Sequence, residues 1–435
     1  MNPTIDFSVV KNIHMIGVGG IGMSGLARLF LAEGKKVSGS DKSESQITEA
    51  LFSEGLKFYK TQVPENIAPG IDLVVYTDAM SADNPELKEA RASGIPALNY
   101  FEALGLIANP YYQIAIAGTH GKTTTTAMTI DIFEAGHLDP SAIVGSLRNA
   151  THSNYRRGKG KYFIVEACEY RRHFLALTPT ILAITNVEAE HLDYYHDLED
   201  VISAFRELAF KVPEDGVVIV NAKDPIIKRI VDGIPATVID YVGYLDLMHP
   251  LKLPGLHNRM NAAVAKAIAA HEKIATRTIN LALARFVGTW RRFEYKGITD
   301  TGAVVYDDYG HHPSEIRATL LGARELFPGK KITVVFQPHL YSRTAQLFGD
   351  FVDALAPADR VVLADIYAAR EDNPDNVTSA QMAEAIHTKN KNSQYYESFE
   401  RIAKEVKEGT GEQDVILVMG AGDIWNVAEL LTKKE

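Results

Sequence analysis

The chain has 435 residues and a net charge of −10, and its composition is 46% hydrophobic and 23% charged. A chain of this length exceeds what one hydrophobic core usually holds, so two or three domains are expected. The acidic balance argues against nucleic-acid partners, which favour a basic surface. The single cysteine, Cys168, excludes an internal disulfide framework and is typical of a reducing cytosol.

No membrane insertion or secretory leader is expected. The N-terminal residues lack a basic stretch followed by an apolar run. No segment approaches the roughly eighteen uninterrupted apolar residues that a membrane span needs. We therefore expect a cytoplasmic protein, and the sequence leaves open whether it is a monomer or a homodimer.

Strands that alternate with helices are predicted along the whole chain, which is typical of parallel or mixed sheets flanked by helices. A fresh apolar strand after Pro110 and the run Trp290-Arg291-Arg292-Phe293-Glu294 mark two boundaries, so we expect three α/β domains at residues 1–109, 110–295 and 296–435. The predicted strands are 13–16, 36–41, 73–76, 113–117, 162–165, 180–185, 217–220, 304–306, 332–336, 360–363 and 415–419, and the clearest helices are 23–32 and 258–271.

The first glycine loop, Gly17-Val18-Gly19-Gly20-Ile21-Gly22, fits the G-x-G-x-x-G pattern between a strand and a helix. Asp41 follows roughly 20 residues later, as the dinucleotide fingerprint requires. Such glycines let backbone N–H groups approach a diphosphate at a helix N-terminus. The alternative is a tight turn without a ligand. A nicotinamide dinucleotide and a UDP-sugar both contain a diphosphate and a ribose, so the motif leaves both open.

The second glycine loop, Gly118-Thr119-His120-Gly121-Lys122-Thr123-Thr124, ends like a P-loop. The strict pattern requires glycine where this chain has Ile116, so the loop is a shorter relative of that motif. Lys122 and the loop amides are expected to bind the β- and γ-phosphates, and Thr123 is expected to bind Mg²⁺. Four threonines follow Lys122, and they are expected to serve no packing purpose, which argues against a purely structural turn.

Two phosphate-binding loops in one chain indicate a nucleotide-linked substrate and a nucleoside triphosphate. Segments in both loops and in four later stretches resemble the Mur ligase family, in the family's order and over nearly the whole chain. The matching segments are residues 16–26, 118–126, 186–193, 253–261, 307–315 and 337–344.

The resemblance implies a Rossmann-like UDP-sugar domain, a P-loop-like ATPase domain and a dinucleotide-fold-like domain that binds the amino acid. It also implies a reaction in peptidoglycan precursor synthesis. ATP would phosphorylate the carboxylate of UDP-N-acetylmuramate, and the amine of L-alanine would attack the resulting acyl phosphate. Catalysis of this kind rests on positioning and on neutralising the charge of phosphoryl oxygens.

The resemblance makes Glu166 and His191 metal ligands beside Thr123. Imidazole is an unusual ligand for Mg²⁺, so Mn²⁺ is a second candidate cation. The family's usual Ala-Asp-Glu-Ser-Asp is Ala167-Cys168-Glu169-Tyr170-Arg171 here, so two acidic positions are lost and Glu169 is the residue that could compensate. Cys168 is expected to be a small buried residue and not a catalytic thiol.

Two asparagines and an arginine are further expected to contact ATP. Asn258 and Asn261 lie three residues apart at a helix N-terminus, where their amides could pair with adenine. The alternative for Asn258 is a helix N-cap. Arg292 resembles the family arginine that reaches the γ-phosphate, and a surface arginine is the alternative.

In the third domain the resemblance places Asp308 on the ATP ribose and His311 beside the incoming substrates. The pair Asp307-Asp308 next to His311-His312 could instead hold a metal. Arg343 resembles an anchor for the amino-acid carboxylate or the acyl phosphate, which a guanidinium binds through two parallel hydrogen bonds. Some relatives carry a second arginine where this chain has Leu340. The central domain is also expected to be trimmed before Leu253.

Three rival functions remain. A Mur-type ligase that attaches a preformed tripeptide for recycling is the nearest, although the first loop resembles the alanine-adding branch. A nicotinamide-dependent oxidoreductase is supported only by the first loop and Asp41. A non-catalytic nucleotide-binding regulator would tolerate the lost acidic residues, but Glu166 and His191 argue against it.

Overall fold

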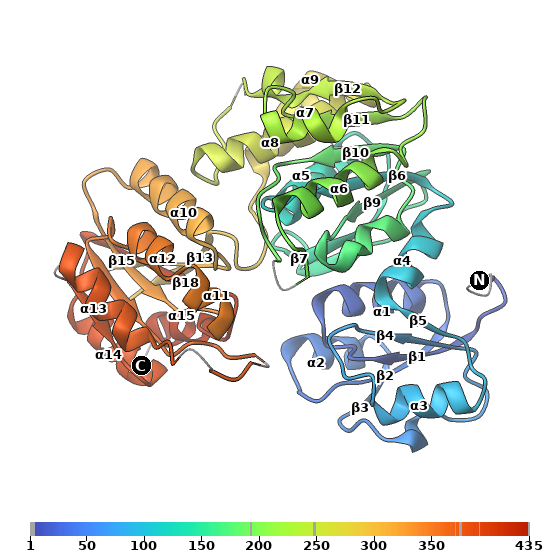
Figure 1. Ribbon diagram of the computed structural model, residues 1–435, viewed down its shortest axis with the longest axis horizontal. Coiled ribbons are helices and arrows are strands. Elements are labelled where there is room, and N and C mark those ends of the chain that lie inside the picture. Colours follow the sequence, from blue (N-terminus) through green and yellow to red (C-terminus); the bar gives the residue numbers. More distant parts are fainter. Residues whose placement is uncertain are drawn as a thin grey trace. The chain divides into compact units, whose positions relative to one another are not determined.

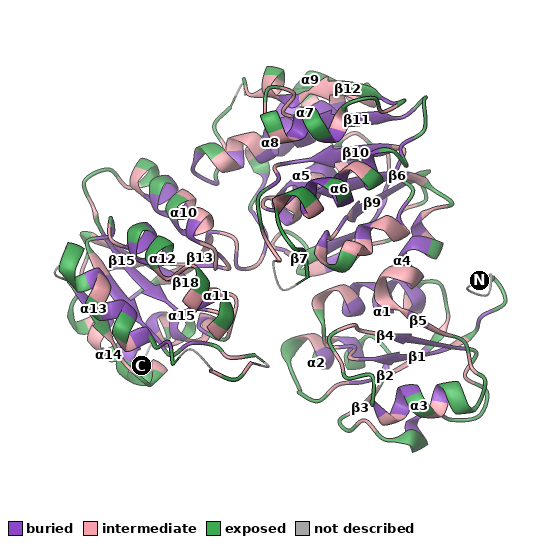
Figure 2. Ribbon diagram, in the orientation of Figure 1, coloured by how far each residue is buried: buried purple, intermediate pink, exposed green. Residues whose placement is uncertain are grey.

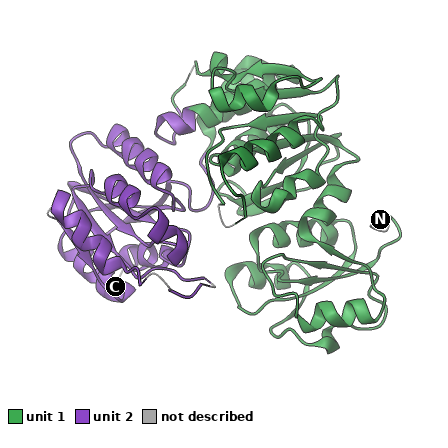
Figure 3. Cartoon of the chain, in the orientation of Figure 1, with its two compact units in different colours: residues 1–250, 260–286 green, residues 251–259, 287–435 purple. Residues whose placement is uncertain are grey.

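The computed structural model describes residues 5–191, 194–246, 249–369, 371–373, 376–390 and 392–433. The chain forms two compact units, one of residues 1–250 and 260–286 and the other of residues 251–259 and 287–435 (Figure 3). The first unit holds two sheets and the second holds one, and helices flank each sheet (Figure 1). The predicted α/β class with parallel or mixed sheets is confirmed.

The first sheet has five parallel strands in the order β3-β2-β1-β4-β5. The chain leaves β1 toward β2 on one side and returns to β4 on the other, which creates a crevice at the carboxyl ends of β1 and β4. The elements are β1 Asn12–Ile16, α1 Ile21–Ala32, β2 Lys36–Ser40, α2 Gln46–Ser53, β3 Lys57–Tyr59, η1 Pro64–Asn66, β4 Leu73–Tyr76, α3 Pro85–Ala92, β5 Ala97–Asn99 and α4 Tyr100–Ala108.

The second sheet has seven strands in the order β12-β11-β10-β6-β9-β7-β8, and only the edge strand β8 runs antiparallel to its neighbour. Its strands are β6 Tyr112–Ala117, β7 Ser141–Arg148, β8 Ser153–Arg156, β9 Tyr162–Glu166, β10 Ile181–Ile184, β11 Val217–Val220 and β12 Thr237–Asp240. Its helices are α5 Lys122–Ala135, η2 Tyr170–Ala176, α6 Leu198–Ala209, α7 Pro225–Val231, η3 Tyr241–Tyr244, α8 Leu256–His271 and α9 Thr276–Arg285.

The segment that follows β12 is short, and helix α8 begins soon after it. Between β12 and Leu253, the described residues form only the short helix η3, in agreement with a trimmed domain. Helix α8 begins at Leu256, so Asn258 lies inside the first turn and is not the N-cap. The N-cap reading was wrong because the helix starts two residues earlier, directly after Pro254-Gly255.

The first two sheets are joined through helix α1, which packs on β7 and β8. A Cβ atom at Gly25 would lie 3.2 Å from Ile143, so a larger residue here would require that side chain to shift. The Asn154 side chain donates to the Ser24 hydroxyl at 2.9 Å and accepts from the Arg28 guanidinium at 2.6 Å. One continuous cluster of buried apolar side chains therefore includes residues of the first and the second sheet, and buried segments occur in both sheets (Figure 2).

The third sheet has six strands in the order β13-β14-β18-β15-β16-β17, with only the edge strand β13 antiparallel. Strand β13 begins at Glu294, two residues before the expected start of the third domain. The elements are β13 Glu294–Ile298, β14 Val304–Asp308, α10 Pro313–Leu326, β15 Lys331–Phe336, α11 Tyr341–Gln346, α12 Phe348–Leu355, β16 Arg360–Leu363, α13 Ser379–Asn390, β17 Ser393–Tyr395, α14 Phe399–Glu408, β18 Asp414–Met419 and α15 Trp425–Thr432.

Among the described residues, no helix combines the length and the apolar character that a membrane crossing requires.

Candidate active site

The first glycine loop lies in the crevice of the first sheet, but most of its amides already have partners. The N–H groups of Gly17 and Val18 donate to the Ser40 carbonyl, and that of Gly20 donates to the Gly17 carbonyl. The Gly19 N–H donates to the Asp41 carboxylate at 2.9 Å. Helix α1 has no side-chain cap, so its first-turn N–H groups form the end of the loop that can bind a diphosphate.

Tyr100 connects this loop to the second sheet. A Cβ atom at Gly22 would lie 2.8 Å from the Tyr100 ring, so the loop and the ring are in close contact. Burial raises the pKa of Tyr100, and the nearby Glu166 and Cys168 raise it further. Tyr100 therefore contacts the start of α1 and lies near enough to Glu166 for that carboxylate to affect its pKa.

The second glycine loop follows β6 and leads into α5, as predicted. Gly118 has a φ of +131°, and a Cβ atom there would lie 2.0 Å from the Thr185 hydroxyl, so no other residue fits. Asn186 holds the loop from the end of β10, because its side chain accepts from the His120 N–H at 3.0 Å and its carbonyl accepts from the Thr119 N–H. Helix α5 has no side-chain cap, which suits an anion at its N-terminus.

The four threonines after Lys122 are packed inside the protein, contrary to the expectation. All four are buried, and Thr124, Thr125 and Thr126 pack beneath the loop, whereas the Thr123 hydroxyl faces Glu166. Among the described residues the buried hydroxyls of Thr125 and Thr126 have no hydrogen-bond partner, whereas the nearby Thr129 hydroxyl donates to the Thr125 carbonyl at 2.8 Å. The phosphate role of the loop now depends on its glycines, on Lys122 and on the uncapped helix.

The predicted metal ligands fall into two groups. Glu166 is the last residue of β9, and it accepts from the Thr123 hydroxyl at 3.1 Å and from the Gly145 N–H. His191 lies with Glu169 and Glu190, with one potential ligand atom of each residue within 4.8 Å of the others. The hydroxyl and carboxylate oxygens of the first group suit Mg²⁺, and the second group adds the imidazole nitrogen of His191.

Cys168 is half-buried, and not fully buried as expected. Burial raises the pKa of its thiol to about 12, and the neighbouring Glu169 carboxylate contributes to the rise. A thiol with this pKa stays protonated at neutral pH and is a poor nucleophile, which agrees with the expectation that it is not catalytic.

The two asparagines of α8 have different surroundings. Asn261 lies against the second glycine loop, because a Cβ atom at Gly121 would lie 2.2 Å from its side-chain oxygen. Asn258 is buried and donates to the Pro254 carbonyl at 2.8 Å. The contact of Asn261 suits a residue beside the nucleotide, and the adenine role of both residues stays a prediction.

In the second unit, Arg291 anchors the segment that carries Arg292. The buried Arg291 guanidinium pairs with Asp307 at 3.0 Å and donates to the carbonyls of Gly420 and Gly422. Burial raises the pKa of Asp307 to about 7, although Arg291 opposes this rise. The guanidinium of Arg292 lies 5.0 Å from the centre of the Tyr309 ring, so the arrangement orients it by a cation–π contact.

Asp308 is also buried, and its carboxylate accepts from the N–H groups of Phe293 at 2.7 Å and Gly310 at 2.8 Å. These bonds hold the end of β14 against the segment after Arg292. They suit a structural carboxylate, and its predicted contact with the ATP ribose stays a prediction. The alternative metal site does not use Asp307 and His312 as expected, because Asp307 pairs with Arg291 and the His312 ring caps α10 by accepting from the Ser314 N–H.

His311 and Arg343 lie near each other, together with His339. Burial lowers the pKa of His311 to about 3, and Arg343 and His339 lower it further against the opposing charge of Glu315. The Nδ1 atom of His311 lies 3.1 Å from the Tyr309 carbonyl, which favours the tautomer with the proton on Nδ1 and leaves Nε2 as an acceptor. A neutral imidazole beside a guanidinium can bind both ends of an amino acid.

Leu340, the departure from the family's second arginine, has a φ of +70° and a hydrogen bond from its N–H to the Tyr367 carbonyl at 2.9 Å. Tyr367 also stacks on His339 with ring centres 5.6 Å apart. The loop before Arg343 is therefore fixed by pairing with the segment around Tyr367.

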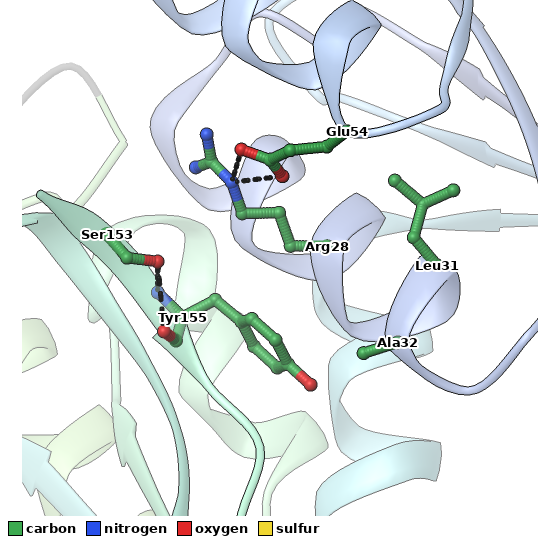
Figure 4. A pocket seen from close by; sticks show the side chains of 6 residues that line it. All are labelled: Arg28, Leu31, Ala32, Glu54, Ser153 and Tyr155. Carbon is green, nitrogen blue, oxygen red and sulfur yellow. Dashed lines mark hydrogen bonds and ion pairs between the residues drawn. The ribbon is translucent and has the colours of Figure 1, made fainter. Parts of the chain in front are cut away.

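A pocket of about 390 Å³ lies elsewhere, between α1 and β8 (Figure 4). Its lining includes Arg28, Glu54 and Tyr155, and none of the predicted site residues. The Arg28 guanidinium in its wall is already bound by the Glu54 carboxylate at 2.8 Å. The predicted site is therefore distinct from this pocket.

Three models of one family match the chain in succession. They are the Mur ligase catalytic domain at residues 12–112, the Mur ligase middle domain at residues 116–244 and the Mur ligase glutamate ligase domain at residues 291–422. A UDP-N-acetylmuramate–L-alanine ligase of Agathobacter rectalis is 42% identical, over 99% of this chain and 99% of that protein. The chain belongs to the Mur ligase family.

Solved structures agree with this assignment. The UDP-N-acetylmuramate–alanine ligase of Thermotoga maritima is 29% identical to this Mur ligase and superimposes with a TM-score of 0.81, over 97% of each chain. A murein peptide ligase of Psychrobacter arcticus, 22% identical, shares the fold with a TM-score of 0.71 over 97% of this chain and 98% of that one. The predicted family and its three-domain fold are confirmed.

Several residues of this Mur ligase site were not identified from the sequence. Asn186 lay in a matching segment, but nothing local indicated that it would hold the loop around His120. Arg291 and Tyr100 act through contacts with residues far away in the chain, and no spacing rule reveals such contacts. Glu169 was noted only as a replacement ligand, and its direct contact with Lys122 was not foreseen.

Proposed function

We propose that this chain is an ATP-dependent ligase that joins L-alanine to the lactyl carboxylate of UDP-N-acetylmuramate, in peptidoglycan precursor synthesis. The observation that carries the proposal is the end-to-end similarity, at 42% identity, to a relative with this activity in its name. The two uncapped helix N-termini at α1 and α5 support it independently, because the reaction needs one place for a diphosphate and one for a triphosphate.

In the first step a carboxylate oxygen of the sugar attacks the γ-phosphorus of ATP, and ADP leaves. The first-turn amides of α1 would hold the diphosphate of the sugar, and the amides after Gly121 would hold the phosphates of ATP. Lys122 would neutralise the negative charge that spreads over the phosphoryl oxygens.

The residues present fit a Mg²⁺ ion. The Thr123 hydroxyl and the Glu166 carboxylate lie 3.1 Å apart and are both hard oxygen donors, and the carboxylate is oriented by the Gly145 N–H. When bound, the cation would neutralise phosphate charge. Mn²⁺ would also fit, because His191 adds a nitrogen donor to the neighbouring group.

In the second step the alanine amine attacks the acyl carbon, a tetrahedral intermediate forms and phosphate leaves. Arg343 would hold the amino-acid carboxylate or the acyl phosphate through its planar guanidinium. His311 would remain neutral, because its pKa of about 3 lies far below neutral pH, and would accept a hydrogen bond from the amine through Nε2. Arg292 would face the γ-phosphate. A cytoplasmic location and a monomeric or dimeric state remain predictions.

The first test is phosphate release from ATP in the presence of UDP-N-acetylmuramate and single amino acids. We expect release only when the UDP-sugar and a small amino acid are both present. L-Alanine should be best, and glycine or L-serine should react more weakly, because one methyl group in a pocket gives about 1–3 kcal/mol of discrimination. Equal release without the UDP-sugar would contradict the proposal. Release with a tripeptide and not with L-alanine would favour the recycling ligase.

The second test concerns the cation. Glu166→Ala should raise the Mg²⁺ concentration needed for half-maximal activity by at least about tenfold, because it removes a charged oxygen donor. Part of the lost activity should return at high Mg²⁺ or Mn²⁺. The exposed carboxylate Glu214 is the matched control, and its replacement by alanine should leave the Mg²⁺ dependence unchanged. A loss of activity that no Mg²⁺ concentration restores would count against a metal role.

A further inference from the structure

All hydrogen-bonding capacity of the Lys122 ammonium is used inside the protein. Its Nζ donates to the carbonyl of Gly118, to the carbonyl of Thr119 at 3.1 Å and to the Glu169 carboxylate at 2.9 Å. An ammonium has three N–H groups, so all three are taken. To bind a phosphate, Lys122 must give up at least one of these partners.

Glu169 is the charged partner, and it is almost fully buried, with only 4% of its side chain exposed. It stands at the start of η2, and its backbone carbonyl accepts from the Tyr195 hydroxyl, so its position is fixed from two sides. Burial alone would raise the pKa of Glu169, but Lys122 and His191 lower it below its ordinary value. The pair is therefore a buried pair of opposite charges.

The geometry around the carboxylate also includes a group of potential cation ligands. The Nε2 atom of His191 lies 3.5 Å from Glu169, and Glu190 completes a group with ligand atoms within 4.8 Å of one another. If Lys122 moves to a phosphate, a buried carboxylate loses its only close positive partner among lysines and arginines of the described residues. Such a charge is strongly unfavourable unless another cation replaces the lost one.

We propose that Glu169 is a positioning residue that competes with the phosphates of ATP for Lys122, and that it thereby makes nucleotide binding depend on a divalent cation. This inference rests on the proposed ATP-binding function of the Lys122 loop. Without a cation, ATP must break the Lys122–Glu169 pair and approach a second negative charge. With a cation, the carboxylate that Lys122 releases faces a positive charge again.

The test is calorimetric binding of ATP to the full chain, in EDTA and in excess Mg²⁺, for the wild type and Glu169→Gln. The neutral amide cannot hold the ammonium as an ion pair and does not repel phosphate. In EDTA, Glu169→Gln should bind ATP about tenfold more tightly than the wild type. Mg²⁺ should increase the ATP affinity of the variant less than it increases that of the wild type. If Glu169 served only to stabilise the loop, Glu169→Gln would bind ATP more weakly than the wild type.

Two further variants keep the test decisive. Glu169→Asp retains the charge and should retain the Mg²⁺ dependence of ATP binding. Glu199→Gln removes an exposed carboxylate that pairs with Arg229 in the same unit, and it should behave as the wild type in both conditions. Binding of UDP-N-acetylmuramate to each variant shows that the first unit has folded.

The inference is overturned if Glu169→Gln binds ATP no more tightly than the wild type in EDTA, or if the aspartate and glutamine variants have the same Mg²⁺ dependence. Absence of ATP binding by the wild type and by Glu199→Gln, with and without Mg²⁺, would instead remove the proposed function itself and this inference with it. The two failures are thus distinguishable in one set of titrations.

Discussion

Lys122→Ala is expected to lower kcat by roughly 10²–10³, equivalent to about 2.7–4 kcal/mol, while the affinity for ATP falls much less. The reason is that the ammonium neutralises the phosphoryl group mainly in the transition state, where charge spreads over the transferring oxygens. Steady-state kinetics combined with calorimetric ATP binding measures both quantities.

The matched control is Lys228→Ala, which removes an exposed lysine on α7 in the same unit and should leave both quantities unchanged. UDP-N-acetylmuramate should still bind Lys122→Ala, because the first glycine loop follows β1 of the first sheet, whereas Lys122 follows β6 of the second sheet. A defect confined to the KM for ATP would contradict the transition-state role of Lys122.

Gly19→Val should weaken binding of UDP-N-acetylmuramate by roughly 5- to 150-fold and leave ATP binding unchanged. A Cβ atom at position 19 would already lie 2.9 Å from the Asp41 carboxylate and 3.1 Å from Thr48. The larger side chain would crowd the loop beside α1, and overpacking of this kind costs about 1–3 kcal/mol. Calorimetry with each nucleotide separately measures the effect.

Gly243→Val is the control, since nothing lies within 4 Å of a Cβ atom at that position. Loss of ATP binding with normal binding of the UDP-sugar in Gly19→Val would reverse the assignment of the two loops. Loss of both would indicate that the substitution disturbs the whole unit.

The elements of the sheets were predictable where buried apolar runs end at a turn. Residues 73–76, 217–220 and 360–363 were predicted with the same bounds as β4, β11 and β16, because central parallel strands are continuous apolar runs. Other ends differ by one or two residues, as for β1 and β6. The start of α8 was missed because Pro254-Gly255 begins the helix earlier than Asn258 would.

Within the site, the local motifs were predictable and the contacts between distant segments were not. The loop at Gly118 could be recognised from its glycines and from Lys122. The contacts of Glu169 with Lys122 and of Arg291 with Asp307 join residues that only the fold brings together. The buried threonines show a further limit, since a polar side chain at a helix start can serve packing as well as chemistry.

The raised pKa of Cys168 has a practical consequence for experiments with fluorescent labels. Because burial raises the pKa of its thiol to about 12, only a very small fraction of the molecules carries the reactive thiolate at neutral pH. The chain has no other cysteine. A cysteine introduced on the surface would therefore react with a maleimide dye far faster than the native thiol, and distances between dyes on the two units could be followed without first replacing Cys168.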